Sequence, residues 1–357
     1  MDFAAPKRVV SIQYLRALAA ILVVVQHANT GPIHLDIVRP DLATFGVDLF
    51  FVISGYIMWT TTSATSRTPR QFWVARIIRI VPLYWAFTSL YLAIELVHPA
   101  ALQNPSTDLA FIVKSYAFVP AVHPVIGNIS PIYSLGWTLN YEMFFYFIFG
   151  VALVVRRRTA RLVAITLALG GLVSAGLAWH PANPILQTYS SELLLEFLFG
   201  ALIGALSERL MSWGARVAGP MLIAATLWLI AAYFGKLSGD DFVLFGLPAV
   251  QTVAGFVALE RRLQIRPVSF ALLIGDASYS LYLSHPFVLR ALYLALPTAT
   301  AAANPAIGLF CIALVSLAAI PIAIVIYRVV ERPILAVLWG ATNYRTVDVL
   351  ATPKTLG

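Results

Sequence analysis

Two side chains with different chemistry lie in one apolar stretch near the N-terminus. Arg16 and His27 stand at either end of ten uncharged, mostly aliphatic residues, ALAAILVVVQ. On an α-helix, eleven positions change the direction of a side chain by only about 20° and its height by roughly 16 Å. A helix here would present a permanent cation and an imidazole on one face, at two depths.

Four other apolar segments also carry ionisable or hydroxyl side chains. An ionised group within hydrocarbon is costly and usually faces a protein interior or a wet cavity. These side chains are therefore candidate site residues if their segments cross a membrane. The segments FGVDLFFVISGY, RIIRIVP, SLGWTLNYEMFFY and GDASYSLYLSHP contribute Asp48 and Ser54, Arg76 and Arg79, Tyr141 and Glu142, and His285, respectively.

The composition predicts an all-α, polytopic membrane protein. Hydrophobic residues make up 60% of the 357 residues and charged residues 11%, against about 25% charged in a soluble domain. The net charge of +8 does not indicate a nucleic-acid partner, because the basic residues are scattered between apolar runs. One cysteine, Cys311, excludes an internal disulfide.

Ten runs are close to the 20 apolar residues that a helix needs to cross a bilayer. We predict spans near 10–28, 43–62, 80–98, 135–155, 162–179, 192–208, 217–234, 241–259, 271–293 and 306–330. They form one membrane domain over residues 1–340, followed by a short cytoplasmic tail over 341–357. The 36-residue loop 99–134 is a candidate lid, since its apolar segment is too short to span.

The basic residues predict the orientation of these spans. Of the 24 Lys and Arg residues, 19 lie at the two termini and in alternate loops and three in the opposite loops, while Arg16 and Arg290 fall inside spans. Positive residues accumulate on the cytoplasmic side, so both termini are expected there. The orientation puts Arg16, Arg76 and Arg79 on the inner side. It puts His27, Asp48, Glu142 and His285 in the outer leaflet, where they can converge.

Each candidate also has a purely structural explanation. His27 could be an interfacial histidine, and Arg16, Arg76 and Arg79 could be anchors that set topology. Asp48 and Glu142 could form ion pairs between helices. Glu192 and Glu196 are expected to be solvated, and a metal site is not expected because the six histidines lack ligand spacing such as HExxH.

Six segments, in this order along residues 11 to about 333, resemble the integral-membrane acyltransferase family three. They are RALAAILVVVQH, FGVDLFFVISGYIM, RIIRIVPLYW, SLGWTLNYEMFFYF, DASYSLYLSHP and VERP. The likeness is to the single-domain branch that O-acetylates exopolysaccharides. The family's signature of a basic residue, a ten-residue gap and a histidine falls on Arg16 and His27, and its arginines after the second span match Arg76 and Arg79.

The resemblance implies transfer of an acyl group, usually acetyl, from cytoplasmic acyl-CoA to a sugar hydroxyl outside a bacterial inner membrane. Some members of the family carry a second, extracytoplasmic domain that this sequence does not show, so polysaccharide-assembly proteins are expected partners. The acceptor would be a glycan or a lipid-linked sugar. Guanidinium groups suit the phosphates of coenzyme A because they are planar, ionised, bidentate donors.

The residues also suggest how the transfer would proceed. His27 would act as general base or transient acyl acceptor, with Glu142 or Asp48 orienting it. Tyr141, His285 and Ser54 would contact substrate, and Ser54 as an acyl carrier is a weaker option. Two other functions stay open from the residues alone, a proton-coupled exporter and a non-catalytic scaffold.

Overall fold

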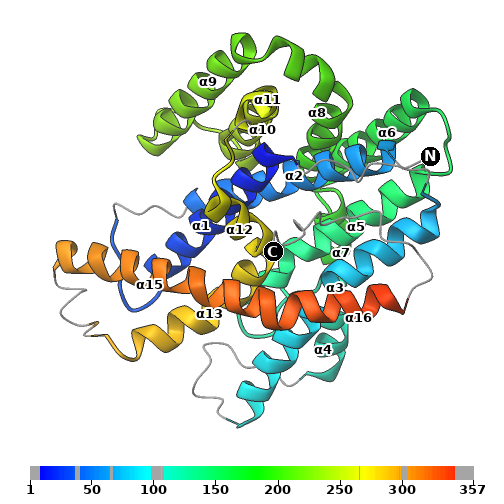
Figure 1. Ribbon diagram of the computed structural model, residues 1–357. Coiled ribbons are helices and arrows are strands. Elements are labelled where there is room, and N and C mark those ends of the chain that lie inside the picture. The colour runs from blue at the N-terminus through cyan, green and yellow to red at the C-terminus, as the bar shows by residue number, and fades with distance from the viewer. Residues whose placement is uncertain are drawn as a thin grey trace. The chain divides into compact units, whose positions relative to one another are not determined.

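The structure is a computed structural model in which α-helices make up nearly all the regular secondary structure (Figure 1). It describes residues 9–36, 41–64, 67–97, 106, 108–264, 266–296, 298 and 304–341. Apart from Ala341, the predicted cytoplasmic tail lies outside the described residues, as does His98. The only strand-like pairing in the described part is a single bridge between Val122 and Ile129. The predicted all-α fold is confirmed.

The described helices follow one another along the chain, joined by turns and loops. Their bounds are α1 Val10–Asn29, α2 Asp41–Ala64, α3 Pro69–Val97, α4 Leu109–Tyr116, η2 Ser134–Gly136, α5 Trp137–Ala152, α6 Arg158–Trp179, α7 Pro184–Tyr189, α8 Leu193–Trp213, α9 Ala215–Tyr233, η3 Phe242–Gly246, α10 Leu247–Ala258, α11 Glu260–Leu263, α12 Ser269–Asp276, α13 Ser278–Tyr293, α15 Pro305–Ile326, η4 Tyr327–Glu331 and α16 Arg332–Gly340.

Each of the ten predicted spans coincides with a helix or with consecutive helices. Among the described residues, six helices are long and apolar enough to cross a bilayer: Val10–Asn29, Ala43–Ser63, Pro69–Val97, Arg158–Trp179, Ala215–Tyr233 and Pro305–Gly340. The remaining predicted spans fall on α5, α8, η3 with α10, and α12 with α13. The count of ten spans therefore stays a prediction.

Several helix boundaries differ from those expected. Helix α3 begins at Pro69 instead of near residue 80, so Arg76 and Arg79 lie within a helix and not in the loop before it. The two π-helical turns, η3 and η4, are each followed within two residues by a proline, Pro248 or Pro333. Proline has no N–H for the helical ladder, which accounts for the change of hydrogen-bond register at both places.

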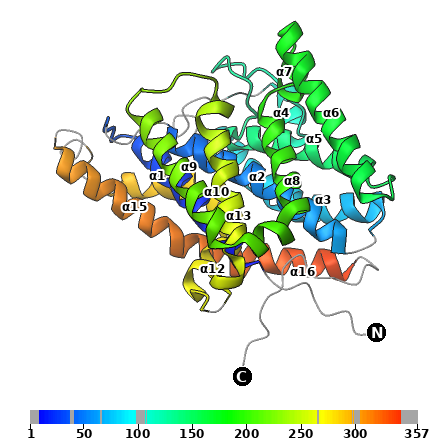
Figure 2. The same ribbon diagram turned by 90° about the horizontal axis from the view of Figure 1, so that it is seen from above.

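The contacts divide the chain into two compact units. Unit 1 comprises the chain up to Ser66 and from Gly200 onward, and unit 2 comprises Arg67–Phe199. In unit 1, α1 packs against α2, α10, α12, α13 and α15, and α9 lies beside α10 (Figure 2). In unit 2, α5 packs against α3, α6 and α7. The helix with Arg16 and His27 thus contacts several other helices of unit 1.

The carboxylate of Glu260 caps the N-terminus of α1. Its two oxygens accept hydrogen bonds from the backbone N–H groups of Val10 (2.8 Å) and Ser11 (2.7 Å), and the side chain is buried. The first N–H groups of a helix have no partner within it, and the helix dipole favours a negative charge at this end. Glu260 thereby fixes where α1 begins.

Small residues bring other helices close to α1. A Cβ atom at Gly46 of α2 would lie 2.8 Å from the Ala19 carbonyl oxygen and 3.0 Å from Cγ2 of Val23. A Cβ atom at Gly275 of α12 would lie 2.3 Å from the carbonyl oxygen of Gln13. Both glycines permit a backbone approach that a side chain would prevent.

Much of the outer surface is apolar, as lipid contact requires. Large side chains on several long helices are more than half exposed, among them Leu167 and Trp179 of α6 and Phe310 and Leu317 of α15. Exposed apolar side chains on several long helices fit contact with lipid tails. Together with the apolar helices, this surface identifies a membrane protein.

We expect Gly46→Ala to destabilise unit 1 because the added methyl group meets the α1 backbone. Overpacking typically costs about 1–3 kcal/mol. The midpoint of thermal unfolding of the detergent-solubilised protein should fall. In the control Gly170→Ala, the added Cβ has no atom within 4 Å, and the better helix propensity of alanine should leave the midpoint unchanged or slightly higher. Equal midpoints for the two variants would show that α1 and α2 do not approach as described.

Candidate active site

Three contacts join α1 to α13 within unit 1, and they follow the same order along both helices. Arg16 Nη2 donates a hydrogen bond of 3.0 Å to Ser278 Oγ. The ring of His27 meets that of His285 edge to face, with 4.9 Å between the ring centroids and 65° between the planes. The Tyr293 hydroxyl donates to the Ala28 carbonyl. The shared face of Arg16 and His27 that the sequence predicts is therefore the face that packs on α13.

The hydrogen bonds of the two histidines define the same tautomer. Nδ1 of His27 lies 2.8 Å from the Val23 carbonyl oxygen, and Nδ1 of His285 lies 3.2 Å from that of Leu281. A carbonyl oxygen only accepts, so Nδ1 carries the hydrogen in each neutral ring. The Nε2 atom of each neutral ring then carries a lone pair and no hydrogen, which is the form that a general base needs.

Buried polar atoms accompany this histidine pair. Gln26 Oε1, Ser284 Oγ and His285 Nε2 are all inaccessible and have no hydrogen-bond partner among the residues that the structure describes. Gln26 and Ser284 directly precede His27 and His285 in the chain. Buried polar groups are normally satisfied, so these three atoms have unused capacity for hydrogen bonds to a ligand.

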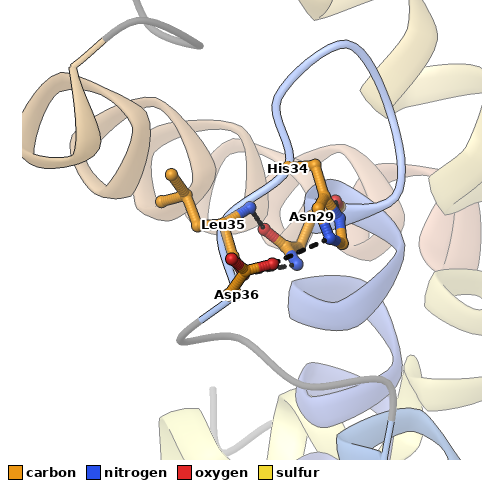
Figure 3. A network of polar contacts seen from close by, with 4 residues as sticks. All are labelled: Asn29, His34, Leu35 and Asp36. Atoms are coloured by element: carbon orange, nitrogen blue, oxygen red, sulfur yellow. Dashed lines mark hydrogen bonds and ion pairs between the residues drawn. The ribbon is translucent and has the colours of Figure 1, made fainter.

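The C-terminal end of α1 is fixed by a side chain that pairs with the backbone (Figure 3). The amide of Asn29 donates to the Leu35 carbonyl (3.1 Å) and accepts from the Leu35 N–H (2.8 Å). His34 adds a contact to the Asn29 carbonyl (3.2 Å) and an exposed ion pair with Asp36 (3.5 Å). The exposed pair contributes little, but the Asn29 contacts hold the turn that follows His27.

Asp48 and Ser54 lie on α2, which packs against α1. Both side chains are buried, Asp48 with 1% of its surface exposed. Asp48 comes two residues after Gly46, where α2 approaches the turn of α1 that carries the Val23 carbonyl. The predicted role of Asp48 toward His27 and that of Ser54 toward substrate stay predictions.

In unit 2, Arg76 lies in an aromatic setting between α3 and α5. Its guanidinium carbon is 5.8 Å from the centroid of Phe72 and 5.9 Å from that of Tyr146, and only 4% of the residue is exposed. The Tyr146 hydroxyl donates to Glu142 Oε1. Nε and Nη2 of Arg76 are buried without a hydrogen-bond partner in the described part of the chain. Two unused donors on a permanent cation fit an anionic ligand.

The other predicted residues of unit 2 are half-buried. Arg79 lies one turn after Arg76 on α3, and Tyr141 lies on α5 with its ring 5.9 Å from that of Trp137. The expectation that Glu196 is solvated is wrong, since its side chain is fully buried. The next residue, Phe197, stacks on Phe145 with 4.6 Å between centroids, which places this turn of α8 inside unit 2.

Sequence reasoning missed the partners that hold these groups. Ser278 accepts a hydrogen bond from Arg16. Tyr146, which packs against Arg76, donates a hydrogen bond to Glu142. Ser280 donates a hydrogen bond to the buried Glu331 (2.5 Å). Only the Glu142–Tyr146 pair had a local signal, the four-residue spacing of a helix. The described residues contain no group of three or more His, Cys, Asp or Glu side chains arranged to hold a metal ion.

The described part of the candidate lid is tied to α3 of unit 2. Asp108 caps α4 by accepting from the N–H groups of Ala110 and Phe111. The Tyr84 hydroxyl and the Trp85 indole donate to the carbonyls of Ser115 and Tyr116 (3.1 and 2.9 Å). Residues 99–105 of the predicted loop lie outside the described residues, and the lid role stays a prediction.

His123 organises the loop that follows α4. Its side chain is buried, and Nδ1 accepts from the N–H groups of Val125 (3.2 Å) and Ile126 (3.4 Å). Its ring also lies 5.0 Å from that of Phe111. Burial lowers the pKa of His123 below 6.5, because desolvation penalises the charged form.

Comparison with known proteins identifies relatives across most of the chain. Residues 9–328 match the family described as an acyltransferase domain. The exopolysaccharide production protein ExoZ of Rhizobium meliloti (strain 1021) is 35% identical over 298 residues, covering 81% of this chain and 89% of that protein. The peptidoglycan O-acetyltransferase OatA of Listeria monocytogenes serovar 1/2a is 31% identical over 165 residues, covering 42% of this chain and 25% of that protein. No solved structure matches.

We expect acidification to loosen the loop around His123. A histidine with a lowered pKa in the folded state contributes stability that is present above pH 6.5 and is lost as the pH falls toward its folded value. The N–H groups of Val125 and Ile126 should lose protection from hydrogen exchange between pH 7 and pH 5, after correction for intrinsic rates. His123→Gln should remove most of this pH dependence. Equal protection at both pH values in the unaltered protein would contradict the role of His123.

Proposed function

This chain belongs to the acyltransferase family, and we propose that it moves an acetyl group from cytoplasmic acetyl-CoA to a sugar hydroxyl outside the cell. The acceptor is an exopolysaccharide, another extracytoplasmic glycan or a lipid-linked sugar. The names of two relatives support this choice, one a protein of exopolysaccharide production and the other an O-acetyltransferase of peptidoglycan. Family membership favours an enzyme over the exporter or the scaffold.

The observation that carries the proposal is the state of His27. Its Nδ1–H is used on the Val23 carbonyl, so Nε2 carries a lone pair in the last turn of α1, the outer end of the helix in the proposed orientation. A sugar hydroxyl is a poor nucleophile at neutral pH, and an imidazole that takes its proton makes attack on a thioester possible. Direct attack and a two-step route through acyl-His27 both use this lone pair. Asp48 and Glu142 are the proposed carboxylates that favour the protonated imidazole.

The donor side of the proposal rests on the arginines. Arg76 fits an anionic group because it is buried with two donors unused, and Arg79 is one turn further along α3. We assign the phosphates of acetyl-CoA to Arg76, Arg79 and Arg16. Arg16 is half-buried, and its bond to Ser278 holds the guanidinium two turns before His285 along α13. Tyr141, Ser54 and His285 are proposed to contact substrate.

The proposal places the protein in the cytoplasmic membrane of a bacterium. The apolar runs favour ten spans, and the charge distribution favours both termini in the cytoplasm. In this orientation, acetyl-CoA enters from the cytoplasm and the acceptor glycan stays on the other side of the membrane. The family resemblance supports residues 1–340 acting as one domain. Other proteins of polysaccharide assembly are the expected partners, and no metal is needed for the steps described.

We expect His27→Ala to reduce acyl transfer by about 100-fold to 10,000-fold, the usual worth of a general base. Transfer is measured as O-acetyl groups on the cell-surface glycan and as turnover of acetyl-CoA by the purified protein. Expression and acetyl-CoA binding should survive. The control is His180→Asn, because His180 is exposed at a left-handed position (φ 43°) that asparagine tolerates.

A His27→Ala protein that acetylates its glycan within a few-fold of the unaltered chain would overturn this assignment. If the alanine variant does not accumulate, His27→Gln keeps size and polarity without the base. The glutamine variant should be as inactive as predicted for alanine.

We expect Arg76→Gln to weaken acetyl-CoA binding about 10-fold to 100-fold, because hydrogen bonds to charged groups are worth roughly 1.5–3 kcal/mol. The KM for the glycan should change much less. Arg76→Lys should restore binding only in part, since lysine lacks the planar fork. The control Arg156→Gln removes an exposed arginine of the loop before α6. Equal acetyl-CoA affinity in all variants would make Arg76 a topology signal only.

A further inference from the structure

A capping box fixes the start of α3 in unit 2, directly after Arg67. The Gln71 side chain accepts a hydrogen bond from the backbone N–H of Thr68 (2.9 Å), and the Thr68 hydroxyl accepts one from the backbone N–H of Gln71 (3.3 Å). This reciprocal pair, with Pro69 as the first residue of the helix, defines a helix N-terminus. The backbone of Arg67 therefore has a defined place, one residue before the N-cap.

The side chain of Arg67 lies close to a second cation, Arg76. Burial and the positive charge of Arg76 both lower the pKa of the Arg67 guanidinium. Arg67 is half-buried, whereas Arg70, three positions later, is exposed. An arginine that only sets topology gains nothing by approaching a like charge, because its long side chain can turn its head toward water. The place of Arg67 therefore favours a role in binding.

Arg76 extends this group of cations to a third arginine. The charge of Arg79 opposes that of Arg76, while the carboxylate of Glu142 favours it. Nε and Nη2 of Arg76 are buried and have no hydrogen-bond partner among the residues that the structure describes. We call Arg67, Arg76 and Arg79 the arginine cluster. Its like charges repel each other most strongly where water is scarce, so an anion in contact with them would lower the free energy of the arrangement.

Coenzyme A offers this cluster two kinds of phosphate. A diphosphate adjoins the pantetheine arm, and a monoester phosphate sits on the 3′-oxygen of the ribose, farther from the thioester. The monoester carries nearly two negative charges at neutral pH, and its oxygens match the fork of a guanidinium. In the proposed orientation α3 begins at the cytoplasmic face, so Arg67 lies nearest the cytoplasm and Arg76 and Arg79 lie deeper. A donor that enters thioester first leaves its ribose phosphate at the outermost arginine.

We propose that Arg67 binds the ribose 3′-phosphate of acetyl-CoA, while Arg76 and Arg79 bind the diphosphate. The inference rests on the proposed function and deepens it, because it names the residue that selects coenzyme A over a donor without that phosphate. Arg67 is not among the arginines to which the family resemblance pointed. The ribose phosphate is remote from the thioester, so Arg67 contributes to donor affinity and not to the chemical step.

The test compares acetyl-CoA with acetyl-dephospho-CoA, which lacks only the ribose phosphate. Binding of each donor to the purified full-length protein is measured. We expect the unaltered chain to bind acetyl-CoA about 10-fold to 100-fold more tightly, the usual worth of hydrogen bonds between charged groups. Arg67→Gln should weaken acetyl-CoA binding by the same factor and leave the affinity for acetyl-dephospho-CoA almost unchanged. The preference between the two donors should therefore disappear in this variant.

Three further variants separate this role from others. Arg76→Gln should weaken the binding of both donors, because both carry the diphosphate. Arg70→Gln removes an exposed arginine from the same end of α3 and should change neither affinity. Arg67→Lys keeps a positive charge for topology but lacks the planar fork, so it should retain only part of the preference for acetyl-CoA. The lysine variant carries the test if Arg67→Gln does not accumulate.

Equal affinity of the unaltered chain for the two donors would overturn the proposal. Equal weakening of both donors by Arg67→Gln would also overturn it, since a structural effect on Arg76 predicts that result, and so would no weakening of either. In the lysine variant, a preference as large as that of the unaltered chain would have the same meaning. Failure of the unaltered chain to bind either donor would instead refute the proposed function.

Discussion

The register of α1 on α13 is the constraint on which the chemistry of unit 1 depends. Arg16, His27 and Ala28 meet Ser278, His285 and Tyr293 in the same order along both helices. A polar side chain among apolar helices is stable only where a partner is placed to receive it. Glu260 holds the N-terminal end of α1 and Asn29 holds its C-terminal end. Between these ends, Gly46 allows α2 to pack closely against α1. The position of one imidazole is therefore set by contacts along the entire helix.

In unit 2, the buried cation Arg76 is stabilised by aromatic contacts instead. Arg76 packs against the faces of Phe72 and Tyr146, while Glu142 is held by the Tyr146 hydroxyl. Aromatic faces offset part of the cost of burying a guanidinium, and Nε and Nη2 of Arg76 have no hydrogen-bond partner among the described residues. The two unused donors then remain for a ligand. An arginine held by a direct bidentate carboxylate pair would be as stable but would have less to offer a phosphate.

The sequence predicted the parts of this arrangement that depend on helical geometry and composition. The spacing of Arg16 and His27 predicted a shared face, and the apolar runs predicted helices at all ten places. It failed where a partner decides the outcome. Arg76 was read as part of a loop because positive charges usually flank spans, yet aromatic neighbours from α5 allow it to be buried inside α3. Ser278 and Tyr146 could not be assigned, because no local pattern shows which helices will face each other.

The central claim is that this chain carries an acetyl group from a cytoplasmic donor to an acceptor on the other side of the membrane through His27. The most direct measurement uses everted membrane vesicles, whose outer surface is the cytoplasmic face. Labelled acetyl-CoA is added outside, and the label in the enclosed glycan is measured. Vesicles with the unaltered chain should accumulate labelled O-acetyl groups, and vesicles with His27→Gln should not. Equal labelling in both, or labelling only when acetyl-CoA is enclosed with the glycan, would contradict the account.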